Sequence, residues 1–313
     1  MFRPANPGLG SPVATVQEGI VRKEQYLAVF NTSWEQLLQA AEMDMEAPVP
    51  SCPGWNARTL VGHMGGVFTF WNKWVRDRPR PADAAAITEL HAEREAALPG
   101  YLTWRDQGFT AAATPPGVVQ FATRYQAELW ARLAELPPQE PVWTFFPPDR
   151  TAGFVQRRIA HETTMHRWDA QAAQSIVEPF DDEIACDGID EFLDAIIQVI
   201  YASRTDQGTL PSYGGERYRF HRIDGSGEWL VEFAPDGIRV QRASGPSDVS
   251  IGGSVSDLLL FLYGRMTAHG LAVSGHSDLG QRWPGRSDGG PGHGGTGSGT
   301  GNRTPTHQGH SRA

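Results

Sequence analysis

Glu162 and His166 lie four residues apart in a segment with the pattern of one amphipathic helix. Because four residues complete about one helical turn, both side chains project from the same face. A carboxylate and an imidazole placed in this way can bind one divalent cation. The pair could equally form a solvated helix face, with Arg158 holding Glu162 from one turn earlier. The spacing leaves both interpretations open, and a third ligand is needed to decide between them.

His161 and Glu162 also begin a pattern that is close to the metalloprotease motif His-Glu-x-x-His. Met165 occupies the position of the second motif histidine, and the five-residue step to His166 points the two rings about 140° apart. We therefore predict that His161 is not a ligand. The histidines beyond Trp283 lie in a segment with no means of orienting them, so His63 is the better third ligand.

Four helices are predicted to position these side chains, because apolar residues recur at three- and four-residue steps. They cover residues 23–43, a segment capped by Asn56 that runs through Trp74, residues 118–136, and a segment capped by Thr151 that carries Glu162 and His166. Residues 78–117 are predicted to be a long connection with one short helix around 87–97. Helices with facing apolar stripes form a bundle, and bundles build metal sites from inward side chains.

The hydrophobic period changes after a fifth predicted helix at 181–202. Alternation predicts strands at 218–223, 228–234 and 238–241, the last two joined by a Pro235-Asp236-Gly237 turn, and Ser254 and Asp257 form a capping box before another helix. The Gly/Ser-rich end of the chain cannot bury a core. We thus predict an α+β protein with a flexible N-terminus (1–22), a helical bundle (23–178), a smaller C-terminal α+β domain (179–283) and a disordered tail (284–313).

Composition favours small-molecule chemistry. The net charge is −9, and no basic block is long enough to follow phosphates, which argues against nucleic acid and anionic membranes as partners. Only two cysteines, Cys52 and Cys186, are present, so a reducing cytoplasm is the expected location. Residues 1–19 lack the pattern of a signal peptide, and no later segment has the apolar length of a membrane span.

Two sequence signatures resemble those of the mycothiol-dependent maleylpyruvate isomerase-like family, which belongs to the DinB-like metalloprotein superfamily. The first signature is Val49-Pro50-Ser51-Cys52-Pro53-Gly54-Trp55 followed by Leu60-Val61-Gly62-His63-Met64-Gly65-Gly66. The second is Pro141-Val142-Trp143-Thr144, then Arg158-Ile159-Ala160-His161-Glu162, then His166-Arg167-Trp168-Asp169-Ala170. The resemblance covers roughly residues 23–283.

This resemblance implies a DinB-like four-helix bundle and a divalent metal, usually zinc, held by His63, Glu162 and His166. Three protein ligands leave one coordination position open, as in catalytic zinc sites. The implied co-substrate is mycothiol, the low-molecular-weight thiol of actinobacteria, whose thiolate the cation would stabilise. The expected enzyme is a mycothiol-dependent S-transferase or a cis–trans isomerase acting on a small electrophile, with no catalytic residue beyond the metal site.

Several residues near these signatures have two possible roles. Asp169 lies seven residues after Glu162 and could accept a hydrogen bond from a ligand histidine or pair with an arginine. Cys52 could act as a nucleophile, but its turn-like surroundings favour a structural role, and Trp55 is predicted to be a packing residue. The second-domain residues Arg222, His221 and Arg239 could face the site and bind carboxylates, or could simply be solvated.

Two other classes of function stay open at the level of sequence. An open cation position could also activate water, which would make the protein a metal-dependent hydrolase. Alternatively, the bundle and second domain could bind a small ligand without catalysis. Hydrolysis without added thiol would favour the first, and ligand binding unaffected by His63→Ala would favour the second.

Overall fold

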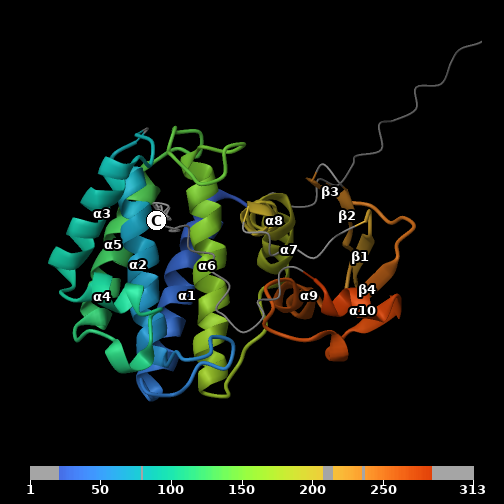
Figure 1. Ribbon diagram of the computed structural model, residues 1–313, viewed down its shortest axis with the longest axis horizontal. Coiled ribbons are helices and arrows are strands. Elements are labelled where there is room, and N and C mark those ends of the chain that lie inside the picture. The colour runs from blue at the N-terminus through green and yellow to red at the C-terminus, as the bar shows by residue number, and fades with distance from the viewer. Residues whose placement is uncertain (1–20, 79, 207–213, 235–236, 284–313) are drawn as a thin grey trace, which may run out of the picture.

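The computed structural model describes residues 21–78, 80–206, 214–234 and 237–283. A helical bundle lies at one end of the molecule and a β-sheet at the other. Between α6 (Ala152–Ala173) of the bundle and the sheet lie the helices α7 (Asp182–Glu191), α8 (Ile197–Asp206) and α9 (Val255–Leu262) (Figure 1). The predicted α+β fold class, with an N-terminal helical bundle and a smaller C-terminal α+β domain, is confirmed.

Some predicted segments lie outside the described residues. These are residues 1–20 of the predicted flexible N-terminus, the whole predicted tail 284–313, and Pro235 and Asp236 of the predicted turn. The predicted domain boundary at residue 178 falls between the end of α6 at Ala173 and the start of α7 at Asp182, and it stays a prediction.

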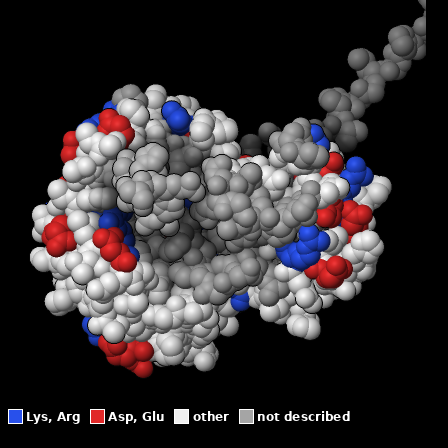
Figure 2. Space-filling view, in the orientation of Figure 1, with Lys and Arg blue, Asp and Glu red and all other residues white. Residues whose placement is uncertain are grey.

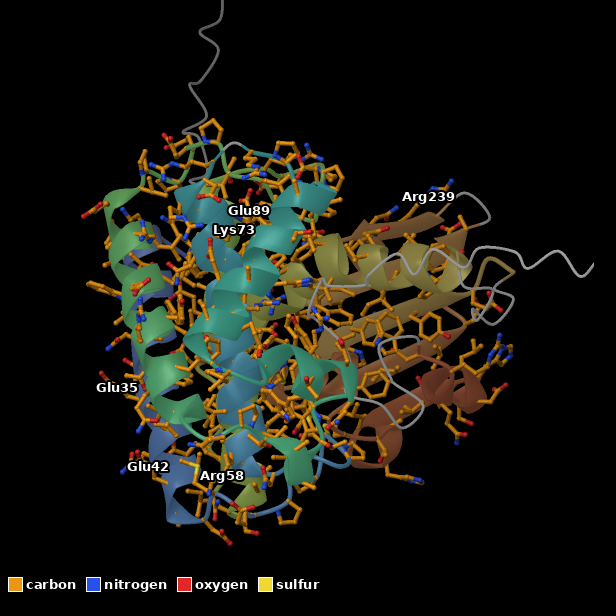
Figure 3. The ribbon with its side chains drawn as sticks, turned by 60° about the vertical axis from the view of Figure 1, so that its left-hand side comes forward. Glu35, Glu42, Arg58, Lys73, Glu89 and Arg239 are labelled. Atoms are coloured by element: carbon orange, nitrogen blue, oxygen red, sulfur yellow. The ribbon has the colours of Figure 1, made fainter. Side chains whose placement is uncertain are left out.

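The four predicted helices form the bundle as α1 (Lys23–Met43), α2 (Ala57–Arg76), α5 (Val118–Glu135) and α6 (Ala152–Ala173). α1 packs along α6, and α2 packs along α5. The two predicted caps are present, since Asn56 accepts a hydrogen bond from Thr59 N and Thr151 accepts one from Phe154 N. On α1 the polar residues Glu35 and Glu42 are exposed and point away from the bundle (Figure 3), so each helix buries the stripe that its sequence predicts.

Glycine brings α2 close to α5. A Cβ atom at Gly65 would lie 2.5 Å from Phe121 Cδ1 and 3.1 Å from Ala122 Cα. Because those atoms belong to a buried ring and a helix backbone, neither can move aside cheaply. Gly65 of the first sequence signature therefore allows the close approach of α2 and α5 beside His63.

The connection between α2 and α5 contains more helix than the sequence predicts. The short helix expected around 87–97 begins earlier, as α3 (Ala84–Ala97), because Asp83 caps it by accepting from Ala86 N. The prediction missed α4 (Tyr101–Asp106) and a 3₁₀ turn at Ala111–Ala113. α4 is only six residues long, and its buried Tyr101 and Trp104 are too few to show a helical period.

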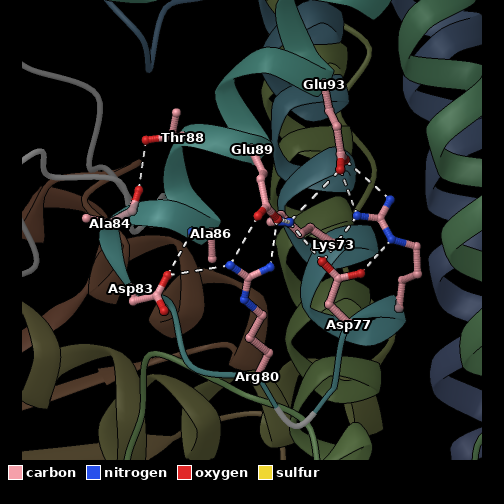
Figure 4. A network of polar contacts seen from close by, with 10 residues as sticks. Lys73, Asp77, Arg80, Asp83, Ala84, Ala86, Thr88, Glu89 and Glu93 are labelled. Atoms are coloured by element: carbon pink, nitrogen blue, oxygen red, sulfur yellow. Dashed lines mark hydrogen bonds and ion pairs between the residues drawn. The ribbon is translucent and has the colours of Figure 1, made fainter.

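A buried lysine fastens α3 to the C-terminal end of α2. The Lys73 side chain is fully buried, and its Nζ lies 2.8 Å from Asp77 Oδ2 and 2.9 Å from Glu89 Oε2. Arg80 also pairs with Glu89, and Arg76 pairs with Glu93 (Figure 4). Figure 3 shows Lys73 and Glu89 where the two helices meet. This ionic network holds a helix whose sequence has little apolar stripe.

The predicted helix 181–202 is present but is interrupted. Asp181 caps α7 by accepting from Glu183 N and Ile184 N. A π-helical segment at Phe192–Ile196 follows, and α8 then continues to Asp206. The five residues of this segment are too few to show a separate period in the sequence.

The C-terminal sheet has five strands in the order β3-β2-β1-β4-β5. Three of them match predicted strands to within one residue, and two were missed because they are short and end in glycine. The bounds are β1 (Arg217–Arg222), β2 (Glu228–Ala234), β3 (Gly237–Gln241), β4 (Val249–Gly253) and β5 (Ala272–Gly275). β1 and β4 pair in parallel, and all the other pairs are antiparallel.

Alternating residues of the sheet build the second core. Tyr218, Phe220 and Phe233 are fully buried and surround the Trp283 ring, which is 1% exposed. The predicted Ser254 cap begins α9 by accepting from Asp257 N, and α9 packs on β4 and α7. A helix α10 (Ser277–Gln281) follows β5.

On the face seen in Figure 2, acidic and basic side chains are interspersed over both ends of the molecule. Among the described residues, none of the helices combines the length and apolar character that crossing a membrane requires.

Candidate metal centre

The structure brings His63, Glu162 and His166 together inside the bundle. One ligand atom from each of the three side chains lies within 4.8 Å of the other two. His63 comes from α2, and the other two residues come from adjacent turns of α6. Glu162 and His166 are buried, with 6% and 7% of their surfaces exposed. The tertiary fold thus supplies the third side chain that the helical spacing alone lacked.

The distances fit a small divalent cation. Glu162 Oε1 lies 3.5 Å from His166 Nε2, and the His63 and His166 ring centroids are 5.1 Å apart at an interplanar angle of 73°. In a tetrahedral site with bonds of about 2.0–2.1 Å, adjacent ligand atoms are about 3.3 Å apart. Small side-chain movements would therefore place all three donors on one ion. Two imidazoles and one carboxylate form the donor set of catalytic zinc sites.

Asp169 fixes the orientation of the His166 ring. His166 Nδ1 lies 2.8 Å from Asp169 Oδ2, and the carboxylate is completely buried. An ionised carboxylate can only accept, so Nδ1 donates its hydrogen to Asp169, and Nε2 is the ring nitrogen that faces Glu162. A carboxylate behind a histidine in this way orients the ring and makes it a more basic ligand.

The two roles considered for Asp169 are both present. In addition to His166, its oxygens accept hydrogen bonds from Arg265 Nη2 at 2.9 Å and from Ser51 Oγ. Ser51 belongs to the loop before α2, and Arg265 follows α9 in the C-terminal domain. The Asp169 carboxylate therefore connects three parts of the protein. These are the loop of the first sequence signature through Ser51, α6 through His166, and the second domain through Arg265.

The charges in the centre shift the pKa values of its acids. Burial alone would raise the pKa of Glu162, but the hydrogen bond from His166 and the charge of Arg158 lower it to about 2. Burial would likewise raise the pKa of Asp169, but Arg265 and His166 hold it well below its usual range. For His166, burial favours the neutral form, and the hydrogen bonds to Asp169 and Glu162 outweigh it and raise the pKa. The pocket thus favours positive charge.

His161 lies outside this group, in line with the failed metalloprotease motif. Its Nε2 is 2.7 Å from Asp187 Oδ2 on α7, and the same carboxylate oxygen accepts from Tyr26 Oη at 2.9 Å and Arg157 Nε at 3.0 Å. This second histidine–aspartate pair connects α1, α6 and α7.

Cys52 and Trp55 have the surroundings of structural residues. Cys52 is completely buried, and burial raises the pKa of its thiol to about 12. A thiol in this state is a poor nucleophile near neutral pH. Trp55 is 4% exposed, and its ring packs 4.9 Å from the His63 ring. The loop that contains both residues therefore supports His63 and Ser51.

The three second-domain residues considered as carboxylate binders have partners within that domain or on α7. Arg222 pairs with Asp182 at 2.7 Å and with Asp224 at 2.9 Å, and Ser250 Oγ lies 3.4 Å from His221 Nδ1. Arg239 is at the sheet end of the molecule in Figure 3 and pairs with Glu232. The second-domain arginine that does reach the centre, Arg265, gave no sequence signal.

Comparison with known proteins finds a matching family model. Residues 27–171 match the family model described as the mycothiol maleylpyruvate isomerase N-terminal domain. The match covers the helical bundle from α1 to α6. The matched residues of the mycothiol maleylpyruvate isomerase N-terminal domain contain His63, Glu162, His166 and Asp169. The resemblance drawn from the two signatures is thereby confirmed.

A solved structure extends the likeness in fold to the C-terminal part. The crystal structure of a histidine-to-alanine mutant of the mycothiol-dependent maleylpyruvate isomerase has 16% identity and a TM-score of 0.50, covering 81% of this chain and 93% of that chain. The crystal structure of the mycothiol-dependent maleylpyruvate isomerase matches with the same identity and coverage and a TM-score of 0.48. Comparison with proteins of curated function gives no match.

Proposed function

We propose that the protein is a metal-dependent enzyme that activates the thiol of mycothiol and adds it to a small electrophile. The observation that carries the proposal is the meeting of His63, Glu162 and His166 within 4.8 Å, inside a bundle of the mycothiol maleylpyruvate isomerase N-terminal domain family. His63, Glu162 and His166 would hold the cation, with zinc the expected metal. When bound, it would stabilise the thiolate form of mycothiol, which is the nucleophile.

The charge balance of the centre supports a divalent cation with one anionic ligand. The linked ion pairs contain the two guanidiniums of Arg158 and Arg265 and the three carboxylates of Glu162, Glu191 and Asp169. With both histidines neutral, this set carries one negative charge in excess. A divalent cation together with one thiolate would bring the buried cluster to neutrality, which low-dielectric surroundings favour.

The protein's own residues would orient the metal ligands and leave the reacting sulfur to the co-substrate. Asp169 holds His166 with Nε2 toward the cation position, and Arg158 occupies the second oxygen of Glu162. Because Cys52 is buried with a raised pKa, the reacting sulfur would come from the co-substrate. Addition of a thiolate to a conjugated cis double bond leaves a single bond that rotates, and elimination then returns the thiol and the trans product. In a transferase the thioether would instead be kept.

Metal analysis followed by mycothiol titration tests the proposal. We expect near-stoichiometric zinc in the full chain without an affinity tag, and its loss in His63→Ala and Glu162→Ala. The matched control is His161→Ala, which removes a histidine from the same helix but outside the centre and should keep the metal. Mycothiol should bind only the metal-loaded forms. A well-folded wild type without metal would refute the proposal, and hydrolysis without thiol would replace it with a hydrolase.

A further inference from the structure

The two oxygens of Glu162 have different partners. Oε1 faces His166, at 3.5 Å from Nε2, and Oε2 lies 3.2 Å from Arg158 Nη2. All three side chains are almost fully buried, so water does not compete for either oxygen. The carboxylate therefore presents one oxygen to the cation position, and the other faces a fixed positive charge.

Arg158 is held from the far side by two residues outside the bundle. Its Nη1 lies 2.7 Å from Glu191 Oε2 on α7, and it donates a hydrogen bond to Tyr263 Oη at 3.1 Å just after α9. Glu191 is 1% exposed. The guanidinium thus bridges the metal centre and the C-terminal domain.

The buried ion pair between Arg158 and Glu191 makes fewer aligned hydrogen bonds than a purely structural ion pair needs. Among the described residues, Arg158 Nε and Nη2 and both oxygens of Glu191 are buried without an aligned hydrogen bond. Buried charges that lack aligned partners lower stability, and an apolar pair of similar volume would pack at least as well. Because folding alone does not favour the buried charges of Arg158 and Glu191, their presence is better explained by the contact of Arg158 with Glu162.

We propose that Arg158 is a positioning residue that keeps Glu162 from binding the cation through both oxygens. The inference rests on the proposed function. If Oε2 were free, it would turn toward the cation and fill the coordination position that a thiol needs, because a catalytic site works through a position left open by its three protein ligands. Glu191 and Tyr263 keep the guanidinium in place, so the second domain contributes to the open position through Arg158.

The test compares cobalt-loaded proteins, because visible absorption of Co(II) is strong for tetrahedral sites and weaker when a fifth ligand binds. The variant is Arg158→Met with Glu191→Met, which removes both members of the ion pair and leaves neither charge unpaired. We expect it to bind Co(II), to show weaker visible absorption, and to bind mycothiol at least tenfold more weakly than the wild type. Glu191→Gln should move both readouts in the same direction by a smaller amount.

The matched control is Arg157→Met with Asp187→Asn, which removes the neighbouring arginine–aspartate pair on the same two helices. Its Co(II) spectrum and mycothiol affinity should equal those of the wild type. Near-ultraviolet circular dichroism first establishes that each variant is folded. If Arg158→Met with Glu191→Met is not folded, the Co(II) spectrum and mycothiol affinity of Glu191→Gln test the proposal instead.

The outcomes separate the two proposals. An unchanged spectrum and an unchanged mycothiol affinity in the folded variant would overturn the role of Arg158 and leave the proposed function standing. Complete loss of Co(II) from a folded variant would also overturn it, because Arg158 would then be needed for metal binding itself. A wild type that binds no Co(II), or one whose binding survives His63→Ala, would overturn both proposals.

Discussion

Replacing Asp169 by asparagine should weaken metal binding and stability together. Asp169 is completely buried and accepts hydrogen bonds from His166, Arg265 and Ser51. Asparagine has the same shape, but its amide nitrogen can only donate. In either orientation the amide therefore places a donor against one of these donors, and the negative charge opposite Arg265 is lost.

Two magnitudes follow from the structure. Loss of the carboxylate behind His166 should weaken zinc binding about 10- to 100-fold, the usual effect of removing a partner of a ligating histidine. The Arg265 side chain is only 7% exposed and would keep a buried charge without its counterion. Breaking such a pair costs about 3–5 kcal/mol of unfolding free energy in the metal-free protein.

Asp187→Asn is the control, because Asp187 also pairs with a histidine of α6 and an arginine. That histidine, His161, is outside the metal centre. The Arg157 side chain is 26% exposed and stays partly hydrated, so the cost should be smaller, about 1–3 kcal/mol. Zinc affinity, measured by chelator competition, should equal that of the wild type.

Chemical denaturation of the metal-free proteins measures the stability terms. Equal zinc affinity in Asp169→Asn and the wild type would refute the proposed role of the carboxylate. A similar loss of affinity in both aspartate variants would also refute it, since the effect would then come from general loosening of α6.

Three further predictions concern other parts of the fold. Burial alone would raise the pKa of Asp187, but the hydrogen bond and charge of His161 and the charge of Arg157 lower it from 3.8 to about 2. A lowered carboxyl pKa stabilises the folded state at pH values above the ordinary pKa of the group. The unfolding free energy should therefore fall by about 2 kcal/mol as the pH drops from about 4 to 2. Denaturation curves of Asp187→Asn should lack this pH-dependent loss. Gly65→Ala should destabilise by about 1–3 kcal/mol in urea, because its Cβ would overlap Phe121 and Ala122, and an unchanged midpoint would contradict the close packing of α2 on α5. Cys52→Ala should cost about 1 kcal/mol of stability and leave metal content and mycothiol affinity unchanged, whereas loss of thiol binding would show that Cys52 takes part.

Local sequence patterns predicted the bundle well. The spacing of apolar residues and the caps at Asn56 and Thr151 predicted the helices to within a few residues, because helix formation depends on neighbours three and four positions apart. Elements that lack such a pattern were missed or misjudged. α4 and the π segment at Phe192–Ile196 are too short to show a period, and β4 and β5 are too short and glycine-rich to show alternation.

The sequence by itself determined that Glu162 and His166 share a helix face, since one helical turn separates them wherever the helix packs. Its signatures also pointed to His63 and to the family. Only the tertiary structure decided that His63 converges on Glu162 and His166, that Asp169 meets Arg265, and that Glu191 and Tyr263 hold Arg158. These contacts join residues about 30 to 105 positions apart, such as Arg158 with Glu191 and Tyr263. No local pattern encodes them, because they form only when the bundle and the second domain pack against each other.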